Sequence, residues 1–213
     1  MAFDIVALGT SLGGVQALTR ILADLPADFP APLVVTQHIG HNPSYLVEIL
    51  ERITRLAVTW ALPGEPLEAG KVYIAPPDQH LVISPEKHLT LSSRGPVNHS
   101  CPSVDVMFES VAEVYGRQAI GVVLTGMLYD GAKGAQAIHA AGGTVIVQDP
   151  QTAQAAGMPG AALQSGSANF MVSLENIAAT LVTMTMVKGA ELIFSGRMPP
   201  QCYPPVSSRI FHR

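Results

Sequence analysis

The stretch VALGTSLGGVQAL (Val6–Leu18) joins two patterns of apolar residues that have different periods. Before the break the residues are continuously apolar, which is typical of a strand buried on both faces of a parallel sheet. After the break, apolar residues recur at helical spacing and share one face, namely Leu18, Ile21, Leu22 and Leu25. The glycine-rich GTSLGG between them predicts a sharp strand-to-helix turn with Ser11 at its centre.

Similar strands and helices are expected along most of the chain. A second amphipathic helix is predicted in the segment opened by CPSVDV, where Val104, Met107, Phe108 and Val111 share a face. Short apolar segments predict buried parallel strands at Phe3–Leu8, Pro32–Gln37, Ala119–Thr125 and Thr144–Gln148. This alternation predicts an α/β fold, a three-layer, doubly wound and mostly parallel sheet.

The middle of the chain has a different pattern. The segments KVYIAP, QHLVIS and HLTLSS, residues 71–76, 79–84 and 88–93, alternate apolar with polar residues and are separated by turn residues. Alternation of period two with short turns favours antiparallel pairing. We therefore expect an antiparallel hairpin region, a meander of these three strands, beside the parallel sheet.

Composition limits the class of protein. With 213 residues, 48% of them hydrophobic, we expect one globular domain over residues 1–194 and an extended, proline-containing tail over residues 195–213. A net charge of −4 without a basic cluster argues against nucleic acid as a partner. The sequence holds no apolar run long enough to insert into a membrane. Cys101 and Cys202 lack disulfide or zinc spacing, which favours the reducing cytoplasm.

Ser11 has three interpretations. GTSLG matches the G-x-S-x-G pattern of nucleophile elbows, in which a tight turn lifts a serine above a sheet edge. Glycine-rich turns of this kind also bind phosphate or cap a helix. The stretch matches neither dinucleotide-binding nor P-loop fingerprints, and no cofactor is expected.

A nucleophilic serine needs a base and an acid that orients the base. His38 follows the strand Pro32–Gln37 and Asp130 follows Ala119–Thr125, so both are expected at the same carboxyl edge as Ser11. Asp149, which also follows a strand, is the rival acid, and Asp130 could instead cap a helix starting at Gly131. His41 pairs with His38 as H-x-x-H but lacks a third ligand, so no metal is expected. The remaining histidines are predicted to be packed or solvated: His80, His88, His99, His139 and His212.

Several blocks together resemble the catalytic domain of the chemotaxis protein-glutamate methylesterases over about residues 4–187. These are LGTSLGG, VTQH, KVYIAPPDQHL, GPVN before PSVDVMFESVA, GVVLTGMLYDGAKG and GMPGAA. The resemblance implies a serine hydrolase that demethylates glutamate γ-methyl esters on the cytoplasmic helices of chemoreceptors. These helices are its expected partners. Some members of the family also deamidate glutamines. It assigns the nucleophile to Ser11, the base to His38 and the orienting acid to Asp130. Oxyanion contacts fall on the backbone after the nucleophile, at Leu12, and on Met127.

This chain departs from the family pattern at three places. Leu12 occupies the position at which members usually have Thr. The sequence GMLYDG replaces the usual GMGxDG, so Leu128 and Tyr129 are expected at the rim of the active site. The segment after GPVN reads His99, Ser100 and Cys101 in place of a common His-Arg pair. Because the first strand begins at Phe3, we expect no receiver domain before it and no phosphorylation control within this chain.

Two alternatives stay open at this point. One is a binding module that keeps the fold without catalysis. The other is a hydrolase of an ester or amide unrelated to chemoreceptors.

Overall fold

A computed structural model describes residues 3–40 and 44–187 of the chain. Its main sheet has seven parallel strands in the order β3-β4-β2-β1-β7-β8-β9. The strands are β1 (Ile5–Thr10), β2 (Leu33–Gln37), β3 (Ala57–Trp60), β4 (Lys71–Ile74), β7 (Ala119–Val123), β8 (Thr144–Gln148) and β9 (Phe170–Val172). A separate antiparallel hairpin is formed by β5 (His80–Ile83) and β6 (Leu89–Ser92).

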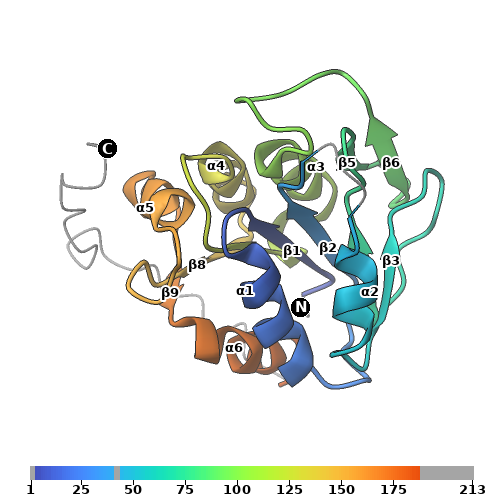
Figure 1. Cartoon of the computed structure of the whole chain (residues 1–213), viewed down its shortest axis with the longest axis horizontal. Coiled ribbons are helices and arrows are strands. Elements are labelled where there is room, and N and C mark those ends of the chain that lie inside the picture. Colours follow the sequence, from blue (N-terminus) through green and yellow to red (C-terminus); the bar gives the residue numbers. More distant parts are fainter. Residues whose placement is uncertain (1–2, 41–43, 188–213) are drawn as a thin grey trace.

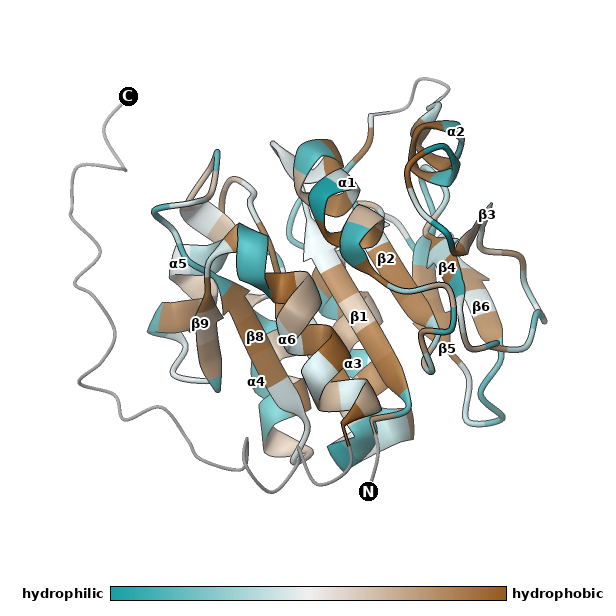
Figure 2. Ribbon diagram, turned by 90° about the horizontal axis from the view of Figure 1, so that it is seen from below, coloured by the Kyte–Doolittle hydropathy of each residue, from teal (hydrophilic) through white to brown (hydrophobic). Residues whose placement is uncertain are grey.

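Helices cover both faces of the sheet, which gives three layers (Figure 1). One face packs against α1 (Gly14–Asp24), α2 (Leu46–Glu51) and α6 (Leu174–Met186). The opposite face packs against the hairpin and against α3 (Val104–Tyr115), α4 (Ala132–Ala140) and α5 (Gly157–Gln164). Strands β1, β2 and β8 are apolar along most of their length (Figure 2), as expected for strands buried on both faces.

The order of the strands creates a switch point beside β1. The chain starts in the middle of the sheet with β1 and β2, goes to the edge strand β3, and comes back with β4 between β3 and β2. It then continues on the other side of β1 with β7. In open α/β sheets, ligand and catalytic groups gather outside the carboxyl ends of the strands at such a point. The residues that follow β1, β2 and β7 therefore share one edge.

The predicted fold class is confirmed, and one detail of the prediction was wrong. The four predicted parallel strands are present, with shifted ends, and the hairpin is antiparallel. The first segment of the expected meander, however, is β4, which pairs in parallel with β2 and β3 inside the main sheet. Val72 and Ile74 are buried in one layer and Tyr73 in the opposite one, because packed elements cover both faces of β4.

Other expectations concern the ends of the chain and the membrane. The predicted tail, residues 195–213, lies outside the described residues. In the described ranges, no helix has the length and apolar character needed to cross a bilayer.

Phe108 should be among the residues that stabilise the fold most. It is fully buried on α3, and its ring and Cβ border Gly121 of β7 and Gly134 of α4. Phe108→Ala should lower the free energy of unfolding by about 3–5 kcal/mol because it removes a large side chain from a packed layer. Urea denaturation measures this. Leu62→Ala, at an exposed position, is the control and should change stability by less than about 0.5 kcal/mol; a similar small change for Phe108→Ala would contradict this packing.

Candidate active site

Ser11 lies in a tight turn between β1 and α1 that only glycines can complete. Gly13 has a φ of 82°, in the left-handed region that favours glycine. A Cβ on Gly14 would lie 1.9 Å from Oε1 of Gln37 and 2.4 Å from Oγ1 of Thr10. The Ser11 N–H donates to the Thr125 carbonyl at 3.0 Å, which ties the turn to the end of β7. The predicted strand-to-helix turn is thus present.

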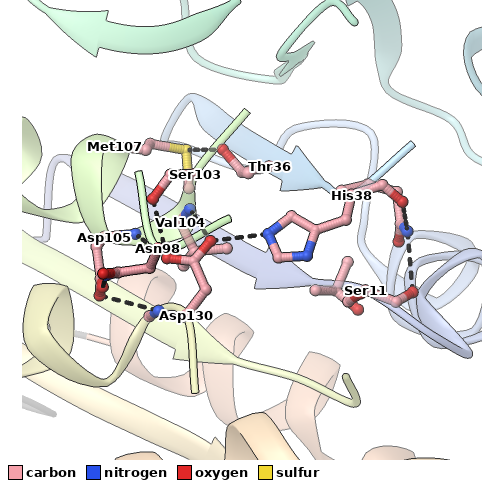
Figure 3. Close-up of polar contacts among 12 residues, drawn as sticks. Ser11, Thr36, His38, Asn98, Ser103, Val104, Asp105, Met107 and Asp130 are labelled. Carbon is pink, nitrogen blue, oxygen red and sulfur yellow. Dashed lines mark hydrogen bonds and ion pairs between the residues drawn. The ribbon is translucent and has the colours of Figure 1, made fainter. Parts of the chain in front are cut away.

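His38 directly follows β2 and lies beside this turn. Its backbone N–H donates to the Thr10 carbonyl at 3.1 Å, which continues the pairing of β1 and β2. Its ring Nε2 lies 2.8 Å from Oδ2 of Asp130, and the imidazole lies between Asp130 and Ser11 (Figure 3). Among the described residues the Ser11 hydroxyl makes no hydrogen bond, so its approach to the imidazole within about 4 Å stays a prediction.

The Asp130 carboxylate is almost fully buried, with 3% of the residue exposed, and is fully hydrogen-bonded. Besides His38, it accepts bonds from the Ser103 hydroxyl at 2.9 Å and from the backbone N–H groups of Val104 at 2.8 Å and Asp105 at 3.0 Å. Burial alone would raise the pKa of Asp130, but the bonds from His38, Asp105 and Val104 outweigh it, so this pKa lies below its ordinary value.

Two carboxylates cap the two helices reciprocally. Asp130, which precedes α4, caps the N-terminus of α3. The alternative role, a cap on its own following helix, is not what the structure shows, since among the described residues the Asp130 side chain makes no bond to the start of α4. Asp105, in the first turn of α3, accepts bonds from Gly131 at 2.9 Å and Gly134 at 2.7 Å at the start of α4. Burial is the main reason that the pKa of Asp105 is raised, and the charge of Asp130 acts in the same direction. Each helix start is thereby fixed by the other.

A buried histidine supports the Asp130 site from the hairpin side. His80 begins β5 and is fully buried. Its Nδ1 accepts the Ser103 backbone N–H at 3.1 Å, so its Nε2 carries the proton and donates to the Gly95 carbonyl at 2.7 Å. His80 is thus a packed imidazole, one of the two expected states. It also orients Ser103, whose hydroxyl donates to Asp130.

A pocket of about 430 Å³ opens beside Ser11. The residues that line it include Gly13, Gly14, Gln16, His38 and Gln154. Within the described part of the chain, the backbone N–H groups of Leu12 and Met127 have no hydrogen-bond partner. They are therefore available to an oxygen atom of a ligand.

The rim of the site is apolar and includes a strained residue. Leu12, Met127, Leu128 and Tyr129 are large hydrophobic residues that are exposed. Leu128 is 60% exposed and has a φ of 63°, in the left-handed region that disfavours a leucine. This is the position at which GMLYDG departs from GMGxDG.

Among the described residues, Asp149 and His88 make local hydrogen bonds and none to Ser11, His38 or Asp130. Asp149 accepts the backbone N–H of Gln151 at 2.9 Å, and Asp130 is the acid that bonds to His38. His88 contacts the Glu86 carbonyl near the hairpin turn. His41 and His212 lie outside the described residues. Over residues 3–40 and 44–187, no three His, Cys, Asp or Glu residues gather as a metal site would require.

Comparison with known proteins places this arrangement in a family. The sequence model described as CheB methylesterase matches residues 6–181. This chain belongs to the CheB methylesterase family. A relative in Leptospira interrogans is 40% identical over 185 residues, which cover 86% of this chain and 96% of that protein. The resemblance found in the sequence is confirmed, as is the expectation of an enzyme family.

The comparisons also find a relative that is longer than this chain and a similar solved structure. The protein-glutamate methylesterase/protein-glutamine glutaminase 4 of Myxococcus xanthus is 43% identical over 180 residues, 84% of this chain but only 51% of that protein. The chain thus spans about half the length of that CheB relative. The crystal structure of the Thermotoga maritima CheB methylesterase catalytic domain aligns with a TM-score of 0.81 at 36% identity. The alignment covers 85% of this chain and 98% of that one.

Sequence reasoning on this CheB family member missed the residues that hold the site together. Asp105, Ser103 and Gln37 were not singled out, because each acts through contacts with segments distant in the sequence. One local signal was present: an acid in the first turn of a predicted helix, as Asp105 is, often binds backbone N–H groups. The signal did not identify which helix it caps.

Asp130→Asn should destabilise the protein in a pH-dependent way. Because the pKa of Asp130 is lower in the folded state than its ordinary 3.8, its charge stabilises the fold above that value and the stabilisation is lost as pH falls through the folded-state pKa. The substitution should cost about 1–3 kcal/mol near pH 7. Urea unfolding at about pH 7 and about pH 3.5 measures the difference, which should shrink at the lower pH.

Asp149→Asn is the matched control for this experiment. Its carboxylate accepts one exposed backbone N–H, so its effect should be small at both pH values. A cost for Asp130→Asn that is constant or grows toward low pH would contradict the assigned direction of the pKa.

Leu128→Gly should stabilise the protein or leave its stability unchanged. The left-handed conformation costs a leucine about 1–2 kcal/mol relative to glycine, and the exposed side chain contributes little packing. Thermal unfolding measures the change. Leu62→Gly, at a residue that is 61% exposed but not in that conformation, should not stabilise. A clear loss of stability in Leu128→Gly would show that the leucine side chain supports the loop.

Proposed function

We propose that this chain is a serine hydrolase that removes methyl groups from glutamate γ-methyl esters on chemoreceptor cytoplasmic helices. The observation that carries the proposal is the 2.8 Å contact between His38 and the buried Asp130 at the sheet edge where the Ser11 turn begins. A histidine held by a buried carboxylate beside a serine is the arrangement that acyl transfer requires. The names of the relatives add the substrate class.

In this mechanism Asp130 fixes the tautomer of His38. The ionised carboxylate can only accept a hydrogen bond, so Nε2 of His38 carries the proton that faces it. The unprotonated Nδ1 is then the base that takes the proton of the Ser11 hydroxyl. The low pKa of Asp130 keeps the carboxylate ionised, and its charge stabilises the imidazolium that forms.

The Ser11 oxygen attacks the ester carbonyl carbon, and the carbonyl oxygen becomes an oxyanion. The N–H groups of Leu12 and Met127, which are without protein partners in the described ranges, are the proposed donors to this oxyanion. Each such donor lowers the barrier by about 3 kcal/mol. Because both are backbone groups, the replacement of the family's usual Thr by Leu12 does not remove them.

Collapse of the tetrahedral intermediate transfers the His38 proton to the leaving oxygen and releases methanol. Water, deprotonated by His38, then attacks the acyl-enzyme, and the glutamate carboxylate departs with return of the proton to Ser11. With a glutamine side chain the same steps release ammonia. The relatives named protein-glutamine glutaminase support this second substrate.

The receptor is proposed to contact the apolar rim. A side-chain ester must project from its helix into the pocket beside Ser11, which brings the surrounding polypeptide against Leu12, Met127, Leu128 and Tyr129. Exposed apolar groups of this kind commonly mark binding surfaces. A chemoreceptor surface that carries apolar side chains beside the methylated glutamate would fit this rim.

Ser11→Ala and His38→Ala should each lower demethylation by about 10⁴-fold or more, and the double variant should be hardly worse because the two residues act as a unit. The assay measures methanol released from purified, methylated receptor cytoplasmic fragments, with a small aryl ester as second substrate. The control is Ser44→Ala, at a serine beyond β2 whose hydroxyl accepts the Leu46 backbone N–H at 3.3 Å; both hydrolysis rates should stay near those of the unaltered protein.

Three results would contradict parts of this proposal. Near-native methanol release by Ser11→Ala would remove the serine mechanism. Hydrolysis of the aryl ester without any release from receptor fragments would point to an unrelated ester or amide as the substrate, and lack of both activities would favour a binding module.

A further inference from the structure

Gln37 is the last residue of β2 and is almost fully buried, with 4% of the residue exposed. It lies directly before His38 and contacts the turn that carries Ser11. Its Nε2 donates to the Ser11 carbonyl at 2.9 Å and to the His38 carbonyl at 2.8 Å. Both bonds lie between the labelled Ser11 and His38 in Figure 3. One amide group thus joins the main chain at the proposed nucleophile to the main chain at the proposed base.

The shape of the surrounding turn holds this amide in one orientation. A Cβ on Gly14 would lie 1.9 Å from Oε1 of Gln37, so the absence of a side chain at Gly14 makes room for the amide. Oε1 is buried and has no hydrogen-bond partner among the described residues. A reversed amide would direct that oxygen at two carbonyl oxygens, which repel it. Only the orientation with Nε2 toward both carbonyls satisfies them.

A buried acceptor without a partner costs free energy, commonly about 1–3 kcal/mol. Gln37 keeps such an acceptor, Oε1, which an apolar side chain of the same length would not have. The two hydrogen bonds of Nε2 offset this cost. Their acceptors belong to Ser11 and His38, the two residues that must meet for acyl transfer. The cost of the unpaired Oε1 is therefore located at the same amide whose Nε2 bonds connect the two main-chain segments.

We propose that Gln37 is a positioning residue that sets the separation of Ser11 and His38 by joining their carbonyl groups. This inference rests on the proposed function. Gln37 does not touch the reacting atoms: it acts through the two main-chain segments, so the approach of the Ser11 hydroxyl to Nδ1 of His38 depends on it. A misplacement of about 1 Å between reacting groups can cost about 100-fold in rate.

Two variants of similar length test this role. Gln37→Met removes the donor and keeps the volume, and Gln37→Glu replaces Nε2 by an oxygen that faces two carbonyls. Each should lower kcat for a small aryl ester by about 10–100-fold with KM within about twofold. Asn169→Ala is the stability control, since Asn169 supports the Val145 backbone N–H toward the amino end of β8, away from the site. It should lose stability with kcat unchanged.

A double-variant experiment separates positioning from general destabilisation. In a Ser11→Ala background, Gln37→Met should change the residual hydrolysis by less than about twofold, because the geometry it sets no longer matters. An equal loss in both backgrounds would overturn the inference. An unchanged kcat in Gln37→Met, together with loss of turnover in Ser11→Ala, would also overturn the inference. Turnover retained by Ser11→Ala would instead contradict the proposed function.

A measurement on the unaltered protein covers the case in which the variants fail to fold. The side-chain amide protons of the buried Gln37, bonded to the Ser11 and His38 carbonyls, should exchange with solvent much more slowly than those of the exposed Gln151. Nuclear magnetic resonance measures both rates. Exchange at Gln37 as fast as at Gln151 would overturn the inference.

Discussion

The burial of the Asp130 carboxylate is the constraint on which the rest of the site depends. A buried charge is costly unless every lone pair is used. Asp130 meets this condition with His38, with the Ser103 hydroxyl and with two N–H groups at the start of α3. The same contacts that make burial tolerable hold the imidazole in one orientation and keep the carboxylate ionised. Stability of the helix layer and readiness for catalysis therefore arise from one set of bonds.

Reciprocal capping extends this constraint to two helices. Asp105 binds the start of α4 while Asp130 binds the start of α3, so neither helix can move along its axis without breaking bonds of the other. On the other side of the site, Gln37 joins the turns of β1 and β2. The proposed nucleophile, base and acid thus come from three adjacent strands and are held by buried polar groups on both flanks.

Much of this could be predicted from the sequence, and the limits have physical causes. Continuous apolar runs identified the buried strands, and the rule that catalytic groups gather at the carboxyl edge selected Ser11, His38 and Asp130. Residues 71–76 were assigned to the antiparallel meander, although they contain the parallel strand β4. An alternating pattern indicates a strand but does not reveal which other strand it pairs with. The roles of Asp105 and Gln37 were not predicted, because only the fold brings these residues close to their hydrogen-bond partners. Leu128 in a left-handed conformation could not be foreseen from the leucine itself, since the backbone of the loop imposes it.

The central claim, that Ser11 is a nucleophile activated by His38 and Asp130, is tested most directly by covalent labelling. A fluorophosphonate reacts with an activated serine and leaves the phosphonyl group on its oxygen. We predict that mass spectrometry of the labelled protein finds the group on Ser11 at neutral pH, and that labelling is lost in His38→Ala. Absence of label on Ser11 in the unaltered protein, or undiminished labelling in His38→Ala, would contradict the claim.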